Sequence, residues 1–475
     1  MNIDITVNMT THNRTTWYAS GLFFIRTLIA RWTSHTPVMD YHSYLNEIGR
    51  NRVPSYIRKQ YEKLICALSK GGPTPVYLSG GLPNENTFPA VKATFQLRDG
   101  TNLELDEAQM KTALQYEASA GNKELLTWIY ELQQQVHNPP TYMNDQHPGK
   151  MACLVTCGAQ QGMSLVMENL VSEGDIVLVE TPAYPGLLAL LTPLKPRMIA
   201  VEADEQGIIP SKLRNVLSRW NPATLEHPGK DGPKILYCVP TCNNPTGASV
   251  TLERKREIYK LAREYKFLIL EDDPYFFLRG KTQIPSFLSI DEDGRVLRTD
   301  SMSKVISAGI RVGILTAATP FIEVFKCHIE VSTQTISGLS QQFLLVLLQK
   351  WGYGGFYKNA QKMSEFYNNR KEECLAEANK YLKDVADWNE PAGGMFMWIK
   401  LKVKDAKPIC DSLVNTRNVF VVPGNTFSIE PEKPCPYIRV SFSNATTEDF
   451  ARAFQCISEV IKDHWREHPY NNNTD

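Results

Sequence analysis

The feature that most constrains the fold is a series of short, continuous apolar runs at residues 152–156, 175–179, 234–239 and 267–270. Each run lacks the alternation of apolar and polar residues that marks a half-exposed strand, so each predicts a parallel strand buried on both faces. Longer stretches that resemble amphipathic helices, such as 252–265, separate the runs. This alternation is typical of a doubly wound α/β domain.

The length of the chain predicts more than one domain. Its 475 residues exceed the roughly 250–300 residues at which a single hydrophobic core stops growing. An amphipathic stretch at 356–382 and strand-like runs at 395–399 and 437–441 predict a smaller α+β domain. We therefore expect an N-terminal extension at 1–38, an arm and helix at 39–75, a large domain at 76–345 and a small domain at 346–475.

The charge balance favours a small-molecule substrate. The 51 Lys and Arg residues equal the 51 Asp and Glu residues, so no overall attraction to nucleic acid or to an anionic membrane is expected. Ten scattered cysteines lack the spacing of zinc ligands, and no metal site is predicted.

Residues 1–38 differ in composition from the rest of the chain. They contain one acid, Asp4, and the arginines Arg14, Arg26 and Arg31. Such a composition is typical of a mitochondrial transit peptide, and it predicts a mitochondrial protein. The alternatives are a secretory signal or a true start at Met39, which would leave a cytoplasmic protein. The uncharged run at 15–25 is too short for the ~20 residues that span a bilayer.

Four polar segments follow predicted strands, where open α/β sheets place their ligands. They are residues 157–162, 243–247, 271–275 and 300–304, the last with Arg311 seven residues beyond it. The first could bind a phosphate with free backbone N–H groups. The third places carboxylates at the end of an apolar strand, so a cation is expected opposite them.

Taken singly, these segments are more simply tight turns and a solvated lysine. Together they supply a lysine, a carboxylate, a phenol and a phosphate cradle, which are the groups that pyridoxal 5′-phosphate requires. The motifs Asn244-Pro-Thr-Gly247, Asp272-x-x-Tyr275, Ser301-x-Ser303-Lys304 and Arg311 resemble the signature of fold-type I aminotransferases. The resemblance extends from about Asp40 to Lys462 and implies a large, mostly parallel seven-stranded sheet domain with a smaller α+β domain.

The resemblance implies catalytic roles for Lys304, Asp272 and Tyr275. Lys304 would hold the cofactor as a Schiff base and carry the proton, and Asp272 would pair with the pyridinium nitrogen. Tyr275 and Asn244 would donate to the phenolic oxygen, and Tyr184 would stack on the ring. The phosphate would be held by Ser301, Ser303, Arg311 and the backbone N–H groups of Ala159 and Gln160, with Ala159 standing where the group often has serine.

The resemblance also assigns the substrate-binding residues. Arg439 would bind the substrate carboxylate together with Asn244, Gly81 would line the pocket, and Arg58 would meet a distal carboxylate. Tyr116 resembles a tyrosine that reaches the phosphate of a neighbouring subunit and also borders the substrate. This implies a homodimer with shared active sites.

Residues 78–84, 237–240, 328–333 and 391–398 most resemble the kynurenine/2-aminoadipate aminotransferases of animals. The resemblance implies transfer of an amino group from L-kynurenine, 2-aminoadipate or a related large amino acid to 2-oxoglutarate. The alternatives on the same fold are a broad aromatic aminotransferase and a β-eliminating lyase, which product analysis would separate. A non-catalytic aminotransferase-like regulator is the remaining alternative, but residues 1–38 are too short for a DNA-reading module.

Overall fold

The computed structural model describes residues 39–70, 72–142, 146–279 and 284–467. The extension predicted at 1–38 lies outside these residues. Within them, no helix has both the length and the apolar character needed to cross a membrane.

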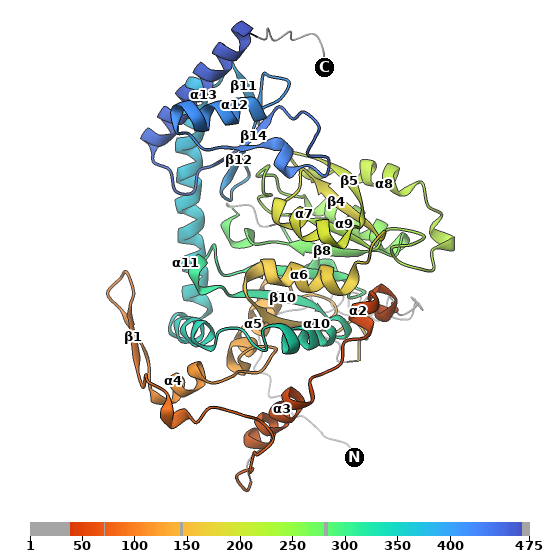
Figure 1. Cartoon of the computed structure of the whole chain (residues 1–475), viewed down its shortest axis with the longest axis vertical. Helices are drawn as coiled ribbons and strands as arrows, with labels where there is room; N and C mark the ends of the chain where they lie inside the picture. The colour runs from red at the N-terminus through yellow and green to blue at the C-terminus, as the bar shows by residue number, and fades with distance from the viewer. Residues whose placement is uncertain (1–38, 71, 143–145, 280–283, 468–475) are drawn as a thin grey trace, which may run out of the picture. The chain divides into compact units, whose positions relative to one another are not determined.

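An eight-stranded sheet forms the larger layer, and its strands β4, β5, β8 and β10 are labelled in Figure 1. The strand order in this sheet is β3-β10-β9-β8-β7-β4-β5-β6. Its strands are β3 (Met151–Thr156), β4 (Ile176–Thr181), β5 (Arg197–Asp204), β6 (Gly207–Ile208), β7 (Ile235–Cys238), β8 (Leu268–Asp272), β9 (Val296–Ser301) and β10 (Gly313–Ala318). The strands β5, β4, β7, β8 and β9 pair in parallel, and β10 is antiparallel to both β9 and β3.

The four apolar runs become β3, β4, β7 and β8, and the predicted mostly parallel sheet is confirmed. The prediction of a parallel strand at 152–156 is wrong, because β3 is an edge strand that pairs antiparallel with β10. All residues of β7 and β8 are buried, as continuous apolar runs require. The sheet has eight strands and not seven because β6, only two residues long, adds a short antiparallel edge to β5.

Helices pack on this sheet through their apolar sides. They include α5 (Lys123–Val136), α6 (Gly158–Leu170), α7 (Pro185–Leu191), α8 (Pro210–Leu217), α9 (Leu252–Glu264) and α10 (Thr319–Ser332). The Thr251 side chain caps α9 by accepting from the backbone N–H of Arg254. The predicted stripe Ile258, Leu261 and Ala262 is fully buried on this helix.

A four-stranded antiparallel sheet forms the smaller layer, in the order β11-β12-β14-β13. Its strands are β11 (Ala386–Trp388), β12 (Phe396–Leu401), β13 (Val422–Pro423) and β14 (Tyr437–Ser441). The helices α12 (Lys407–Ser412) and α13 (Thr447–Glu467) bury Phe450, Phe454 and Ile457 in a core shared with this sheet.

The long helix α11 (Gly338–Tyr381) contacts α4 (Glu107–Leu114) and α5 at one end and α13 at the other (Figure 1). It is interrupted at Gly352, where φ is 61°, a conformation that glycine adopts without a steric penalty. The helix predicted at 356–382 is the second part of α11, and the strands predicted at 395–399 and 437–441 are β12 and β14. The domain limits proposed from the sequence remain predictions.

The N-terminal part carries η1 (Tyr41–Tyr44), α2 (Glu47–Arg50), α3 (Tyr56–Ser69), the hairpin of β1 (Ala93–Gln96) with β2 (Asn102–Leu105), and α4. Several large apolar side chains here are exposed to solvent. Val76 and Leu78 are 85% and 91% exposed, and Tyr56 and Ile57 also face outward.

Candidate active site

A cavity of about 340 Å³ lies beyond the carboxyl ends of β7, β8 and β9 and against the smaller sheet. The predicted residues that line it are Ala159, Gln160, Tyr184, Asn244, Asp272, Tyr275, Ser301, Ser303, Lys304, Arg311 and Arg439. The fold therefore gathers segments that lie almost 300 residues apart, because parallel strands bring their carboxyl ends to one edge of the sheet.

Asp272 is the last residue of β8 and is buried. Its Oδ1 accepts a hydrogen bond from Thr299 Oγ1 at 2.7 Å, and its Oδ2 accepts one from the Tyr237 hydroxyl at 3.0 Å. Because β7 and β9 flank β8, each neighbouring strand supplies one hydroxyl donor. Burial raises the pKa of Asp272 to about 6, while the two hydroxyl donors act in the opposite direction. A protonated ring nitrogen beside this carboxylate would supply the missing positive charge.

Lys304 follows β9 and is partly buried. Burial lowers its pKa, and the nearby positive charge of Arg311 lowers it further. A lowered pKa increases the fraction of neutral amine, which is the form that attacks a carbonyl carbon or accepts a proton.

The N-terminus of α6 and Arg311 form an anion site. Cys157 provides no side-chain cap, so the first N–H groups of the helix remain available to an anion. The Arg311 guanidinium donates to the Cys157 carbonyl at 3.2 Å and to Ser303 Oγ at 3.3 Å. At Gly158 a Cβ atom would lie 2.6 Å from Arg311 Nη2, so glycine permits this close approach. These donors, with the Ser301 hydroxyl nearby, fit a phosphate group.

Arg439 on β14 carries the features of a carboxylate-binding residue. Its Nη1 donates to Asn244 Oδ1 at 3.0 Å, and the centre of its guanidinium lies 4.3 Å from the Phe396 ring. Its Nε is buried and has no hydrogen-bond partner among the described residues. Because a buried unpaired donor costs free energy, this side chain is suited to an anionic ligand that accepts from Nε.

The two predicted tyrosines also face the cavity. Tyr275 is buried, and its ring meets Phe396 edge to face at 6.0 Å. Burial raises the pKa of Tyr275, so its hydroxyl keeps its proton and can donate a hydrogen bond. Tyr184 precedes α7, and burial raises its pKa as well. Stacking of Tyr184 on a ring in the cavity remains a prediction.

The structure does not bring Arg58, Gly81 or Tyr116 to this cavity. The Arg58 side chain is buried, and its guanidinium donates to Ser119 Oγ at 3.1 Å and to the Glu117 carbonyl. Gly81 and Tyr116 are exposed. Their predicted roles therefore depend on a second subunit and stay predictions.

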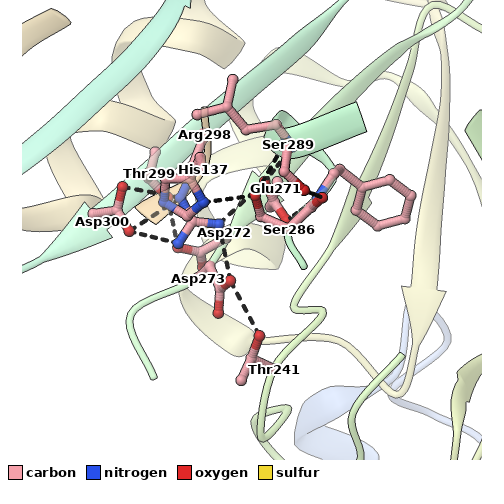
Figure 2. Close-up of polar contacts among 12 residues, drawn as sticks. His137, Thr241, Glu271, Asp272, Asp273, Ser286, Ser289, Arg298, Thr299 and Asp300 are labelled. Atoms are coloured by element: carbon pink, nitrogen blue, oxygen red, sulfur yellow. Dashed lines mark hydrogen bonds and ion pairs between the residues drawn. The ribbon is translucent and has the colours of Figure 1, made fainter. Parts of the chain in front are cut away.

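A buried cluster centred on Arg298 lies next to Asp272 and had not been identified from the sequence (Figure 2). Arg298 on β9 is fully buried, and its guanidinium lies 3.1 Å from Glu271, 2.9 Å from Asp273 and 2.6 Å from Asp300. It is the cation expected opposite the carboxylates of residues 271–275. Because it joins β8 to β9, it holds the strand ends that carry Asp272 and Ser301.

Within the part of the chain that is described, no group of three or more His, Cys, Asp or Glu side chains is arranged to hold a metal ion.

Comparisons with known proteins agree with this geometry. Residues 78–457 match the family model described as aminotransferase class I and II. The mitochondrial kynurenine/alpha-aminoadipate aminotransferase of Bos taurus is 43% identical over 427 residues, which cover 90% of this chain and 100% of that protein. The Mus musculus protein of the same name is 42% identical with the same coverage. The crystal structure of aminotransferase Aro8 from Candida albicans has a TM-score of 0.77 and 25% identity, covering 90% of this chain and 99% of that chain.

Proposed function

The chain belongs to the class I and II aminotransferase family, and from this premise we propose that it moves an amino group from L-kynurenine, 2-aminoadipate or a related large amino acid to 2-oxoglutarate. It is a pyridoxal phosphate-dependent aminotransferase. The observation that carries the proposal is the single cavity in which Lys304, Asp272, Arg311 and Arg439 meet. The names of the relatives at 42–43% identity support the choice of substrates.

When bound, pyridoxal phosphate supplies an electron-withdrawing ring that stabilises the negative charge left at the substrate α-carbon. Asp272 would keep the ring nitrogen protonated, and the hydroxyls of Tyr237 and Thr299 hold both carboxylate oxygens of Asp272 in place. Arg311 and the N-terminus of α6 would bind the phosphate.

Lys304 would hold the cofactor through its Nζ, and the same amine would move a proton from the substrate α-carbon. The lowered pKa of Lys304 favours the neutral amine that this transfer needs. Arg439 and Asn244 bind the α-carboxylate of the substrate, and this fixes which bond at the α-carbon faces Lys304.

We further propose that the protein is a mitochondrial homodimer. The relatives carry the word mitochondrial in their names, and residues 1–38 have the composition of a transit peptide. The exposed apolar side chains of Val76, Leu78 and Ile57 would be covered by a second subunit. Tyr116 and Arg58 would then act at the boundary between subunits.

The dimer is tested by mixing two inactive variants, Lys304→Ala and Tyr116→Phe. If Tyr116 serves the neighbouring site, mixed dimers contain one site with both native residues, and about a quarter to a half of the native activity per dimer returns. A monomer by light scattering, or no recovery in mixed dimers, contradicts shared sites.

Transamination is tested by incubating the purified protein with 2-oxoglutarate and either L-kynurenine or 2-aminoadipate. Glutamate, measured by chromatography, should form with the native protein and with Lys260→Ala, an exposed lysine on α9. None should form with Lys304→Ala. Release of ammonia without glutamate would favour the lyase alternative, and faster turnover of phenylalanine or tyrosine would favour the broad aromatic aminotransferase.

A further inference from the structure

A second cavity lies between the edge of the large sheet and the smaller sheet. Its volume of about 550 Å³ exceeds the 340 Å³ of the active-site cavity and falls in the range of roughly 300–1,000 Å³ that small-molecule sites occupy. The two cavities share no lining residue. The second cavity therefore is a separate space and not an extension of the first.

Aromatic side chains form one wall of the second cavity. Trp388, Trp398, Phe427 and Tyr437 line it. The rings of Trp398 and Tyr437 are stacked on each other at 5.2 Å with an interplanar angle of 6°, so each covers part of one face of the other. None of Trp388, Trp398 and Tyr437 is fully buried. Such a wall favours a planar aromatic ligand.

The charges at the cavity favour a cationic ligand. Asp204, Glu205, Asp387 and Glu390 line it, with Lys400 as the lysine among them. Asp204 pairs with Arg254 and Glu390 with Lys371, both from outside the cavity. Asp387 lies opposite Lys400 in the pairing of β11 with β12, so these two charges offset each other. Glu205 then leaves the lining with one surplus negative charge.

The smaller sheet connects this cavity to the active site. In the antiparallel pair of β12 with β14, Trp398 lies opposite Arg439, so both side chains project from the same face. The Phe427 ring meets Trp398 edge to face at 5.3 Å and lies 5.2 Å from the Arg439 guanidinium. The Phe427 carbonyl accepts from the backbone N–H of Ala183, next to Tyr184. A ligand that moves the Trp398 ring would therefore also shift Phe427, which packs against the Arg439 guanidinium.

We propose that this second cavity binds a planar aromatic cation and that its occupation alters how Arg439 receives the substrate carboxylate. The ring packs against the partly exposed rings of Trp388 and Trp398, and the cation lies near Glu205. The ligand changes the affinity for the substrate carboxylate, and the carboxylate changes the affinity for the ligand by the same factor, because both act on the wall formed by Phe427 and Trp398.

The probe is 1-methylquinolinium, added to the holoenzyme and followed by quenching of tryptophan fluorescence. It has neither a carboxylate for Arg439 nor a primary amine that reacts with the cofactor. We expect saturable binding that weakens about tenfold in both Trp388→Ala and Glu205→Gln. The matched control Asp384→Asn removes an exposed carboxylate nearby that does not line the cavity, and it should bind normally. Quinoline, which is neutral at pH 8, should bind about tenfold more weakly than the cation.

The second readout is the KM for 2-oxoglutarate, which should change with probe concentration and then reach a plateau. Equal binding to the native protein and to both cavity variants would overturn the site. Strict competition with 2-oxoglutarate, without a plateau, would place the probe at Arg439 and also overturn it. Binding of quinoline as tight as that of 1-methylquinolinium would overturn the assignment of a cation. Circular dichroism confirms the folding of each variant. If Trp388→Ala unfolds, the exposed Glu205→Gln alone decides whether the cavity binds the probe.

Discussion

Asp272 lowers the stability of the cofactor-free protein, and the cost depends on pH. Burial raises its pKa from 3.8 to about 6, and two units correspond to about 3 kcal/mol at ~1.4 kcal/mol per unit. The native state binds this proton more tightly than the unfolded state, so the free energy of unfolding falls as pH rises from about 4 to about 6. Above that range the penalty is constant. We therefore expect Asp272→Asn, which keeps the shape of the side chain without its charge, to stabilise the cofactor-free protein.

The expected gain is about 3 kcal/mol at pH 8 and about half as much at pH 5. Urea denaturation of cofactor-free protein, followed by circular dichroism, measures it at both pH values. Asp384→Asn, an exposed carboxylate, is the control and should change the free energy of unfolding little at either pH. The same Asp272→Asn variant should fail to form glutamate. A gain that is equal at pH 5 and pH 8 would refute the explanation by a buried charge.

Three further substitutions test the surroundings of the site. Tyr237→Phe removes one donor to Asp272; the pKa of Asp272 should rise and cofactor affinity at pH 7 should fall about tenfold, and an unchanged titration would contradict this. Arg439→Lys loses the paired geometry for a carboxylate, so the KM for 2-oxoglutarate should rise about a hundredfold; a KM within twofold of native would exclude Arg439 from that contact. Arg298→Met leaves three buried carboxylates without their cation, and urea denaturation should show a loss of about 3–5 kcal/mol that shrinks at low pH.

The segments that line the active-site cavity could be predicted because each is a local pattern of polar residues. Residues 157–162 and 271–275 carry their polar groups directly after an apolar run, and residues 300–304 place a lysine beside two serines. The parallel arrangement of the strands then brings their ends to one edge. No knowledge of long-range register was needed for this part of the site.

Residues whose role depends on register could not be predicted in the same way. Thr299 donates to Asp272 because the two lie opposite each other in the pairing of β8 with β9. In the sequence, Thr299 and Tyr237 resemble ordinary residues of buried strands. Arg298 could be expected only as an unnamed cation, because nothing in its spacing points to Glu271 or Asp300.

Arg58 is a residue whose predicted role is not seen in the structure of one subunit. The resemblance assigned it to the substrate, but within one subunit its hydrogen bonds go to Ser119 and to the Glu117 carbonyl. Both partners lie about sixty residues further along the chain, and no local pattern reveals such a contact. The two-residue strand β6 was likewise too short to form a recognisable apolar run.

The place of β10 in the large sheet has a consequence for the order in which the protein is made. β10 lies between β3 and β9, so β3 (Met151–Thr156) has no partner strand until Gly313–Ala318 has been synthesised. A nascent chain leaving the ribosome therefore carries an apolar strand edge through the translation of β4 to β9, an interval in which chaperones would protect it from aggregation. Arg311 joins α6 only at the end of that interval, and Arg439 emerges later still. The lining of the active-site cavity is therefore complete only after Arg439 has been synthesised.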